Sequence, residues 1–182
     1  MRSKAKSRRK NGRAAGVRRD LQQRTPFRSV AQEATVALLK TAAVIERALA
    51  LCLAPEGLSH EQYNVLRILR GAGDEPLPTL EIRRRMIAEG AAITRLLDKL
   101  EARGYVSRER PAESRRQVLC TITAAGLEAL VRVDDAVNDT DERATRTLSR
   151  TELGTLTSLL DRIRADVREV ARGGHTDGTP AQ

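Results

Sequence analysis

Residues 79–103 read TLEIRRRMIAEGAAITRLLDKLEAR, and this stretch decides the fold. Apolar residues recur at helical spacing on both sides of Glu89-Gly90, which predicts two short amphipathic helices joined by a tight connection. The apolar residues of the second helix share one stripe at i, i+3, i+4 and i+7: Ile93, Leu96, Leu97 and Leu100. The side chains that must then face outward are polar: Thr94, Arg95, Asp98 and Lys99.

The outward face of this second helix suits DNA recognition. It opens with the small residues Ala91, Ala92 and Thr94, which let a helix approach base edges closely. Arg95 and Lys99 follow, and their cations can reach phosphates. A basic amphipathic helix is also typical of a plain solvated surface, so the segment that follows has to separate the two interpretations.

That segment predicts a β-hairpin. Residues 105–110 and 117–123 alternate in character as strands do, and residues 111–116 between them are polar and charged. Helix, turn, helix and hairpin in this order predict a winged helix-turn-helix with arginines at the wing tip. The predicted DNA-binding residues are Thr79, Ala91, Ala92, Thr94, Arg95, Lys99, Ser114, Arg115 and Arg116.

The hairpin and the helix before it resemble a known family. Residues 93–123, ITRLLDKLEARGYVSRERPAESRRQVLCTIT, followed by AAG, resemble the winged-helix core of the MarR family of transcriptional regulators. Residues 58–69, LSHEQYNVLRIL, are similar to that family's second helix, and the resemblance covers residues 26–172. One departure concerns the wing, where the family usually carries Asp-x-Arg and this chain has Ser114 before Arg116.

The resemblance implies both a fold and a function. The fold expected is mainly α with a small β-hairpin wing, in which a winged helix-turn-helix core at about 59–123 is flanked by dimerisation helices at 26–53 and 124–172. The function expected is that of a homodimeric repressor on a pseudo-palindromic operator in double-stranded DNA. A small aromatic or phenolic effector would release it, although no residue names that effector, the operator or the target genes.

The charge of the chain is concentrated at its start. The net charge is +9, yet residues 1–19 alone hold nine Lys or Arg and no acid. Residues 1–24 show no apolar periodicity and are expected to form a disordered basic arm, which either adds salt-sensitive attraction to DNA or only keeps the chain soluble. Residues 173–182 are expected to be a flexible tail. With one Phe, two Tyr and no Trp, the chain lacks the stacking platforms that single-stranded nucleic acids require.

Helix starts are marked by capping residues. Thr25-Pro26 is expected to open the helix that ends near Leu53, and Ser59 with Gln62 has the pattern of a capping box. Thr79 is expected to cap the first helix of the DNA-binding pair, after a loop at 71–78, and Thr123 to open the helix after the wing. The apolar side of that later helix is predicted to carry Leu127, Leu130, Val133 and Val137.

The last helix carries an interaction seam. Ser149 with Glu152 is a second capping box, and the residues after it alternate steps of three and four. This seam is too narrow for a globular core and suits packing against another helix, either the first helix of the same chain or a second copy. The MarR resemblance favours the second copy. The predicted dimerisation residues are Leu153, Leu156, Leu160, Ile163, Val167 and Val170.

The sequence offers little to support catalysis. No nucleophile-and-base motif, glycine-rich phosphate loop or CxxC pair occurs, so neither an enzyme nor a cofactor is expected. Cys52, Glu56 and His60 are too loosely spaced to predict a metal site, and Cys120 is expected to serve packing. Two cysteines suggest no disulfide framework and no apolar run is long enough to span a membrane, which favours a cytoplasmic, nucleoid-associated protein.

Three other functions fit parts of the sequence. A non-specific architectural DNA-binding protein would draw most of its affinity from the basic arm. A redox-responsive regulator would sense oxidants through Cys52. A protein–protein adaptor would keep the fold without binding DNA.

Overall fold

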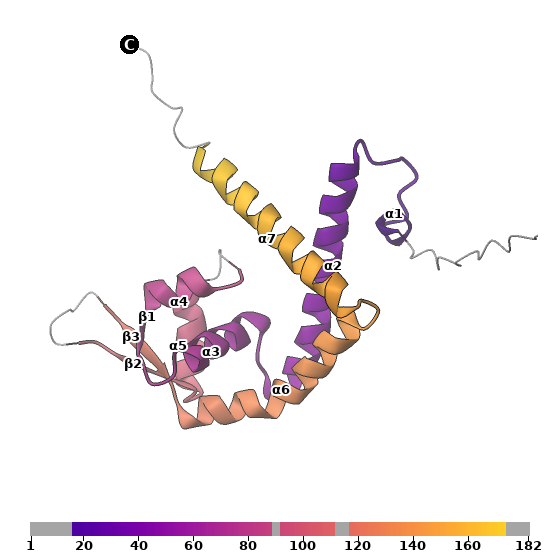
Figure 1. Cartoon of the computed structure of the whole chain (residues 1–182). Helices are drawn as coiled ribbons and strands as arrows, with labels where there is room; N and C mark the ends of the chain where they lie inside the picture. Colours follow the sequence, from indigo (N-terminus) through magenta and orange to yellow (C-terminus); the bar gives the residue numbers. More distant parts are fainter. Residues whose placement is uncertain (1–15, 89–91, 112–116, 174–182) are drawn as a thin grey trace, which may run out of the picture.

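The computed structural model describes residues 16–88, 92–111 and 117–173, which are mainly helical with one small sheet (Figure 1). The elements are α1 (Val17–Asp20), α2 (Val30–Leu53), η1 (Ala54–Glu56), α3 (His60–Ala72), β1 (Leu77–Pro78), α4 (Thr79–Arg85), α5 (Ile93–Ala102), β2 (Val106–Glu109), β3 (Leu119–Ile122), α6 (Ala124–Thr145) and α7 (Arg150–Gly173). The predicted fold class is confirmed. Among the described residues, no helix is long and apolar enough to cross a membrane.

The first long helix starts later than the sequence suggested. The N-cap of α2 is Ser29, whose hydroxyl accepts from the Gln32 backbone N–H at 3.1 Å. The Gln32 side chain in turn accepts from the Arg28 N–H at 2.8 Å. The predicted start at Thr25-Pro26 is therefore wrong, because this pair of side-chain bonds fixes the first turn four residues further on. Val17–Asp20 form one helical turn, so the expected disorder of residues 1–24 does not hold there.

The capping boxes at α3 and α7 are confirmed. Ser59 accepts from the Gln62 N–H, and the Gln62 side chain accepts from the Ser59 N–H at 2.9 Å. At α7, the Glu152 carboxylate accepts from the Ser149 N–H and the Ser149 hydroxyl accepts from the Glu152 N–H. These caps satisfy backbone donors that the first turn of a helix leaves without partners.

The sheet has one more strand than the predicted hairpin. Its order is β1-β3-β2 and all pairs are antiparallel, with Leu77 opposite Cys120 and Arg108 opposite Cys120 on the other side. The prediction that residues 71–78 are a loop is therefore wrong for Leu77–Pro78, and it is also wrong for Gly71 and Ala72, which belong to the end of α3. A strand of two residues that includes a proline can be accommodated at a sheet edge but gives almost no sequence signal.

One hydrophobic core joins the short helices, the sheet and α6. Leu66 and Leu69 of α3, Ile82 of α4, and Leu97 and Leu100 of α5 are all nearly inaccessible. The buried side of α6 consists of Gly126, Ala129, Leu130, Val133 and Val137. Leu127 was predicted to belong to that side but is exposed, because Gly126 faces the Tyr105 carbonyl closely and the next residue lies about 100° further around the helix.

Figure 1 shows α6 running from the wing beneath the short helices toward α2, and α7 lying apart from the short helices of the core. The helix α3 is tied to α6 by a two-pronged ion pair, in which Arg70 donates to Asp134 at 2.7 and 3.2 Å. The winged helix-turn-helix core is thereby held against α6, whereas α7 remains available for other contacts.

We predict that Gly126→Ala destabilises the fold. A β-carbon at Gly126 would lie 2.3 Å from the Tyr105 carbonyl oxygen, and the Thr123 N–H already donates to that oxygen at 3.0 Å. Relieving the clash requires a backbone shift, which costs about 1–3 kcal/mol in a packed core. Chemical denaturation measures the change in the free energy of unfolding.

Gly71→Ala is the matched control for this prediction. No heavy atom lies within 4 Å of the position that its β-carbon would occupy. The replacement should be neutral or should stabilise by up to about 1 kcal/mol, because alanine favours helix over glycine. Equal stability of the two variants would contradict the close contact between α6 and Tyr105.

Candidate nucleic-acid interface

The rotation of α5 is the first feature of the candidate interface. Leu97 and Leu100 are buried at 1% and 0% exposure, Ile93 is buried and Leu96 is half-buried. Thr94, Arg95 and Lys99 are exposed on the other side. The predicted inner and outer faces of this helix are both confirmed, whereas contact between the outer face and DNA stays a prediction.

The exposed side of the start of α5 opens with the small residues Ala92 and Thr94. Ala92 occupies the N-cap, is exposed, and offers no side-chain acceptor to the first turn. Ala91 was also predicted to face DNA but lies outside the described residues, as do the wing-tip residues Ser114, Arg115 and Arg116. A helix end without bulk can approach a base edge or a phosphate closely.

A hollow of about 530 Å³ lies beside the start of α5. The polar groups at its rim come from α4, from α5 and from the segment that leads into β3: Thr79, Glu81, Arg83, Arg84, Thr94 and Gln117. Two arginines and a threonine hydroxyl around a concave surface form a set of donors suited to a phosphate backbone.

Thr79 plays a different part from the predicted one. The N-cap of α4 is Pro78, and Thr79 is the first helical residue. Its hydroxyl donates to the Val118 carbonyl at 3.3 Å and lies 3.8 Å from Cys120 Sγ. The predicted cap is wrong because pairing of Pro78 with Leu119 in the sheet sets the start of the helix. Thr79 therefore fastens α4 to the β3 side of the sheet.

The three consecutive arginines of α4 divide between two uses. Arg85 donates to Glu81 at 2.7 Å, and Arg84 lies 3.8 Å from the same carboxylate. Arg83 and Arg84 line the hollow described above. Because successive side chains of a helix are about 100° apart, the three arginines cannot all lie on one face.

A second hollow joins α5 to the start of α3. It measures about 270 Å³ and is lined by Glu61, Ala92, Arg95, Leu96 and Lys99. Both cations of the outer face of α5 therefore border one concave surface. The hollow extends the exposed face of α5 toward the first turn of α3.

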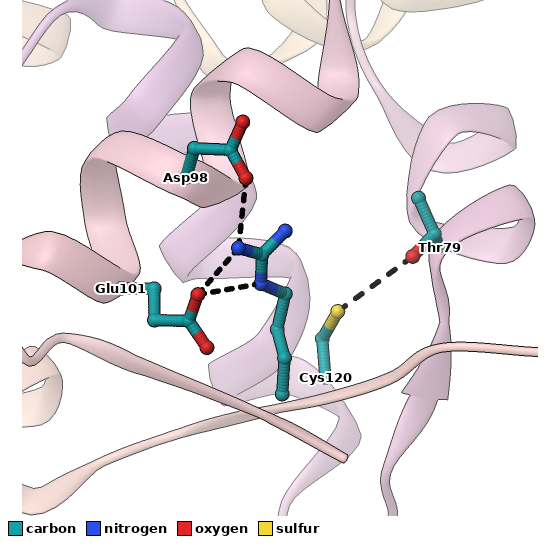
Figure 2. A network of polar contacts seen from close by, with 5 residues as sticks. Thr79, Asp98, Glu101 and Cys120 are labelled. Carbon is teal, nitrogen blue, oxygen red and sulfur yellow. Dashed lines mark hydrogen bonds and ion pairs between the residues drawn. The ribbon is translucent and has the colours of Figure 1, made fainter. Parts of the chain in front are cut away.

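An arginine of the wing holds α5 from the other side, and sequence analysis missed it. Arg108 of β2 lies between two carboxylates of α5, 2.7 Å from Asp98 Oδ1, and its Nε donates to Glu101 Oε2 at 2.9 Å. Figure 2 shows Asp98 and Glu101 converging on one guanidinium, and Cys120 facing Thr79 nearby. Two acidic residues three apart on a helix, followed by an arginine in the next strand, could have indicated this contact.

The Arg108 contact changes the acid–base behaviour of the groups in it. A hydrogen bond from Arg108, reinforced by its charge, lowers the pKa of Glu101. The same hydrogen bond raises the pKa of Arg108. Glu101 is therefore ionised, and its charge is compensated, throughout the neutral range.

The two cysteines and Glu56, which the sequence offered as possible ligands or redox groups, have structural partners. Cys52 is half-buried, with Sγ 2.9 Å from the Thr140 hydroxyl, and burial raises the pKa of the Cys120 thiol. Glu56 is engaged by Arg132 through two hydrogen bonds. Within the described ranges, no three His, Cys, Asp or Glu side chains gather as a metal site.

The predicted dimerisation seam is largely uncovered in the single chain. Leu153 and Leu160 are half-buried, while Leu156, Ile163, Val167 and Val170 are exposed. Exposure rises along α7 to 75% at Val170. Several apolar side chains in a row at helical spacing, open to solvent, are typical of a surface that another helix covers.

Comparisons with known proteins agree with this geometry. A model of the MarR family matches residues 58–118. A MarR transcription factor from Planctomyces limnophilus is 36% identical, with a TM-score of 0.59 over 75% of this chain and 98% of that one. A mutant MarR from Escherichia coli complexed with operator DNA is 26% identical, with a TM-score of 0.63 over 69% of this chain and 89% of that one.

A curated relative is similar over a shorter segment. The HTH-type transcriptional repressor YetL of Bacillus subtilis is 36% identical over 73 residues, which are 40% of this chain and 44% of YetL. Another curated transcriptional regulator is matched over 64% of its length. The chain thus spans less than two thirds of these two curated relatives. Both are named as regulators of transcription.

We predict that the Arg108 contact stabilises the fold in a pH-dependent way. Because the folded pKa of Glu101 is lowered, its contribution is present above the unfolded pKa of about 4.3 and is lost as the pH falls through the folded pKa. Arg108→Gln should therefore lower the melting temperature at pH 7, and the difference from the wild type should shrink toward pH 3.

Arg110→Gln serves as the control for this experiment. Arg110 follows β2 and has no ion-pair partner among the described residues. Its replacement should leave the melting temperature almost unchanged at both pH values, as is usual for exposed charges. A gap between wild type and Arg108→Gln that is the same at pH 3 and pH 7 would contradict the role of Glu101.

Proposed function

Because this chain belongs to the MarR family of transcriptional regulators, we propose that it is a homodimeric repressor that binds a pseudo-palindromic site in double-stranded DNA. The observation that carries the proposal is the rotation of α5, which buries Leu97 and Leu100 and leaves Thr94 and Arg95 exposed. Such a protein acts on chromosomal DNA, so we place it in the cytoplasm on the nucleoid.

In this proposal α5 enters the major groove. Ala92 and Thr94 allow its first turn to approach the base edges, and Arg95 reaches guanine O6 and N7 or a neighbouring phosphate. Lys99, one turn later on the same face, contacts the backbone. Arg83 and Arg84 border the hollow at the start of α5 and would accommodate a phosphate there. Thr79, Ala91, Ser114, Arg115 and Arg116 complete the proposed contact set.

A dimer gives the site its symmetry. In the proposed dimer, α7 packs against its copy through the exposed apolar seam, and a two-fold axis relates the two α5 helices. Two recognition helices about one duplex turn apart, roughly 34–36 Å, then meet successive major grooves. A mutant MarR of Escherichia coli, solved with operator DNA, shares the fold over 89% of its chain and supports DNA binding by this fold.

Release by an effector requires a site between the dimerisation helices and the DNA-binding core. A hollow of about 410 Å³ lies there, between α2, the start of α3 and the residues after α4. Its apolar lining includes Ala43, Ala50, Met86 and Ile87, and Arg47 and His60 stand at its polar side. We propose that a small aromatic or phenolic effector binds this hollow and favours a spacing of the α5 helices that misses the grooves.

The repressor assignment draws on the match with YetL, a transcriptional repressor, over 73 residues. A dimer bound at an operator excludes other proteins from the duplex it covers. An effector that binds only the DNA-incompetent spacing would lift that exclusion by a population shift, without any covalent change.

We predict that Arg95→Ala lowers the discrimination between the preferred site and random duplex. A bidentate contact to guanine is worth about 1–3 kcal/mol, or roughly a 5- to 150-fold change in affinity for the preferred site. Binding to random duplex should fall much less, because phosphate contacts remain. A selected-pool experiment with purified protein identifies the preferred site, and titrations on that site and on random DNA measure the change.

Arg143→Ala is the matched control for the loss of one positive charge. Arg143 is exposed on α6, 3.5 Å from Asp139, and α6 is not part of the proposed DNA contact set. Its replacement should leave the ratio of specific to random binding unchanged. If Arg95→Ala lost affinity equally for both duplexes, the non-specific architectural function would fit better than ours.

We predict that Ile163→Glu breaks the dimer. Ile163 lies near the middle of the exposed α7 seam, and a carboxylate there would be buried against an apolar partner. Analytical ultracentrifugation should show monomers at concentrations where the wild type is dimeric, and binding to a two-half-site duplex should fall in parallel. Ser158→Glu, on the opposite side of α7, should leave the dimer intact. A dimer that survives Ile163→Glu would place the interface elsewhere.

A further inference from the structure

The C-terminal end of α5 is fastened by one arginine that none of the proposed DNA contacts uses. Arg103 is the C-cap of α5, and its guanidinium donates to the Gly57 carbonyl at 2.9 Å and the Glu56 carbonyl at 2.6 Å. It also donates to the Tyr105 hydroxyl at 3.0 Å and lies 4.5 Å from the centre of that ring. All these partners are therefore held by a single planar group.

The two carbonyls belong to the junction between the dimerisation helix and the DNA-binding core. Residues 54–56 form η1, which continues directly from α2, and Gly57 turns the chain toward α3 with a left-handed backbone of φ 57°. Leu53 and Leu58, on either side of this turn, are both buried in the core. The junction is thus fixed at both ends and cannot move independently of α2.

The same junction is connected to α6. The Glu56 carboxylate accepts from Arg132 Nε at 2.8 Å and from the Arg132 terminal nitrogen at 3.0 Å. The α2 helix also contacts α6 through Cys52 and Thr140. One short turn of chain therefore links the long helices α2 and α6 to the end of α5.

We propose that Arg103 is a positioning residue that fixes the direction of α5 relative to the dimerisation helices, and so sets the half-site spacing that the dimer reads. The inference rests on the proposed function, because spacing has meaning only for a dimer on two half-sites. The side chain need not contact DNA. It acts by transmitting the orientation of α2, through the two carbonyls, to the end of α5.

The geometry requires arginine at this position. A guanidinium offers several donors in one plane and can stack on an aromatic face while it donates to two carbonyls. A lysine at the same place would keep the positive charge but would offer a single flexible ammonium group. Arg103→Lys therefore removes the constraint on direction while it preserves the net charge, and with it the general attraction to DNA.

Spacing selectivity provides the test. Starting from the duplex that the wild type selects, one or two base pairs are inserted between the half-sites, and each insertion rotates one half-site by about 34°. We expect one inserted pair to weaken wild-type binding about tenfold and Arg103→Lys binding only about threefold. Affinity for a duplex with a single half-site should stay within about twofold of the wild type, because the reading face of α5 is unchanged.

Two further variants test the interpretation, one as an intermediate case and one as a control. Tyr105→Phe keeps the ring beneath Arg103 and removes one acceptor, so its spacing profile should fall between those of the wild type and Arg103→Lys. Arg143→Lys, on the exposed side of α6, should reproduce the wild-type profile. Melting temperatures of all variants show whether each protein is folded at the assay temperature.

The outcomes separate the inference from the proposed function. A wild-type spacing profile for Arg103→Lys would overturn the inference and leave the proposed function intact. So would an equal loss on single and paired half-sites, because that result indicates a merely structural role. A wild type that prefers no duplex sequence would overturn the proposed function, and this inference with it.

Discussion

The burial of Leu97 and Leu100 fixes the rotation of α5 about its own axis, and the candidate interface depends on that rotation. Successive residues of a helix differ by about 100°, so a helix that buries these two leucines cannot also bury Arg95 or Lys99. Removing a leucine side chain from water contributes roughly 1.5–3 kcal/mol, whereas an exposed ion pair contributes about 0–1 kcal/mol. Packing therefore outweighs charge in deciding which side of α5 faces solvent, and the charges occupy the face that packing leaves open.

The negative charges on α5 must also be compensated if its exposed face is to approach DNA. Asp98 and Glu101 lie on the same helix as Arg95 and Lys99, and two uncompensated carboxylates would repel a phosphate backbone. Arg108 supplies the compensating charge from β2 and binds both carboxylates. Because the cation comes from the wing strand, the contact that lowers this repulsion also fixes the strand against α5. The family's usual aspartate is replaced by Ser114 in this chain, so fastening through Arg108 gives the base of the wing a support that does not depend on position 114.

The features that could be predicted from the sequence are those whose causes are local. The stripe of α5 follows from spacing within ten residues, and the caps at Ser59 and Ser149 each follow from one partner three residues away. The features that were missed depend on residues far apart in the chain. Pairing of Pro78 with Leu119 moved the start of α4 and gave Thr79 a different partner. The partners of Arg103 could not be predicted from the sequence, because they are backbone carbonyls 46 and 47 residues away. The partners of Arg108 lie closer in the chain, and the spacing of Asp98 and Glu101 gave only a weak signal for them.

These long-range partners reduce the number of arginines that are available to bind DNA. Residues 79–116 hold ten basic and six acidic groups, which by itself predicts a broad positive surface. In the folded chain Arg85 is paired with Glu81, Arg108 with two carboxylates, and Arg103 is held by carbonyls and Tyr105. The cations of α5 without an ion-pair partner among the described residues are Arg95 and Lys99, one turn apart beside small side chains. An architectural protein draws its affinity from many unspecific phosphate contacts. A few cations held on a rigid helix provide little of that and instead favour recognition through shape and base edges. The face of α5 therefore supports sequence-specific binding, and unspecific attraction would have to come from the basic residues 1–19.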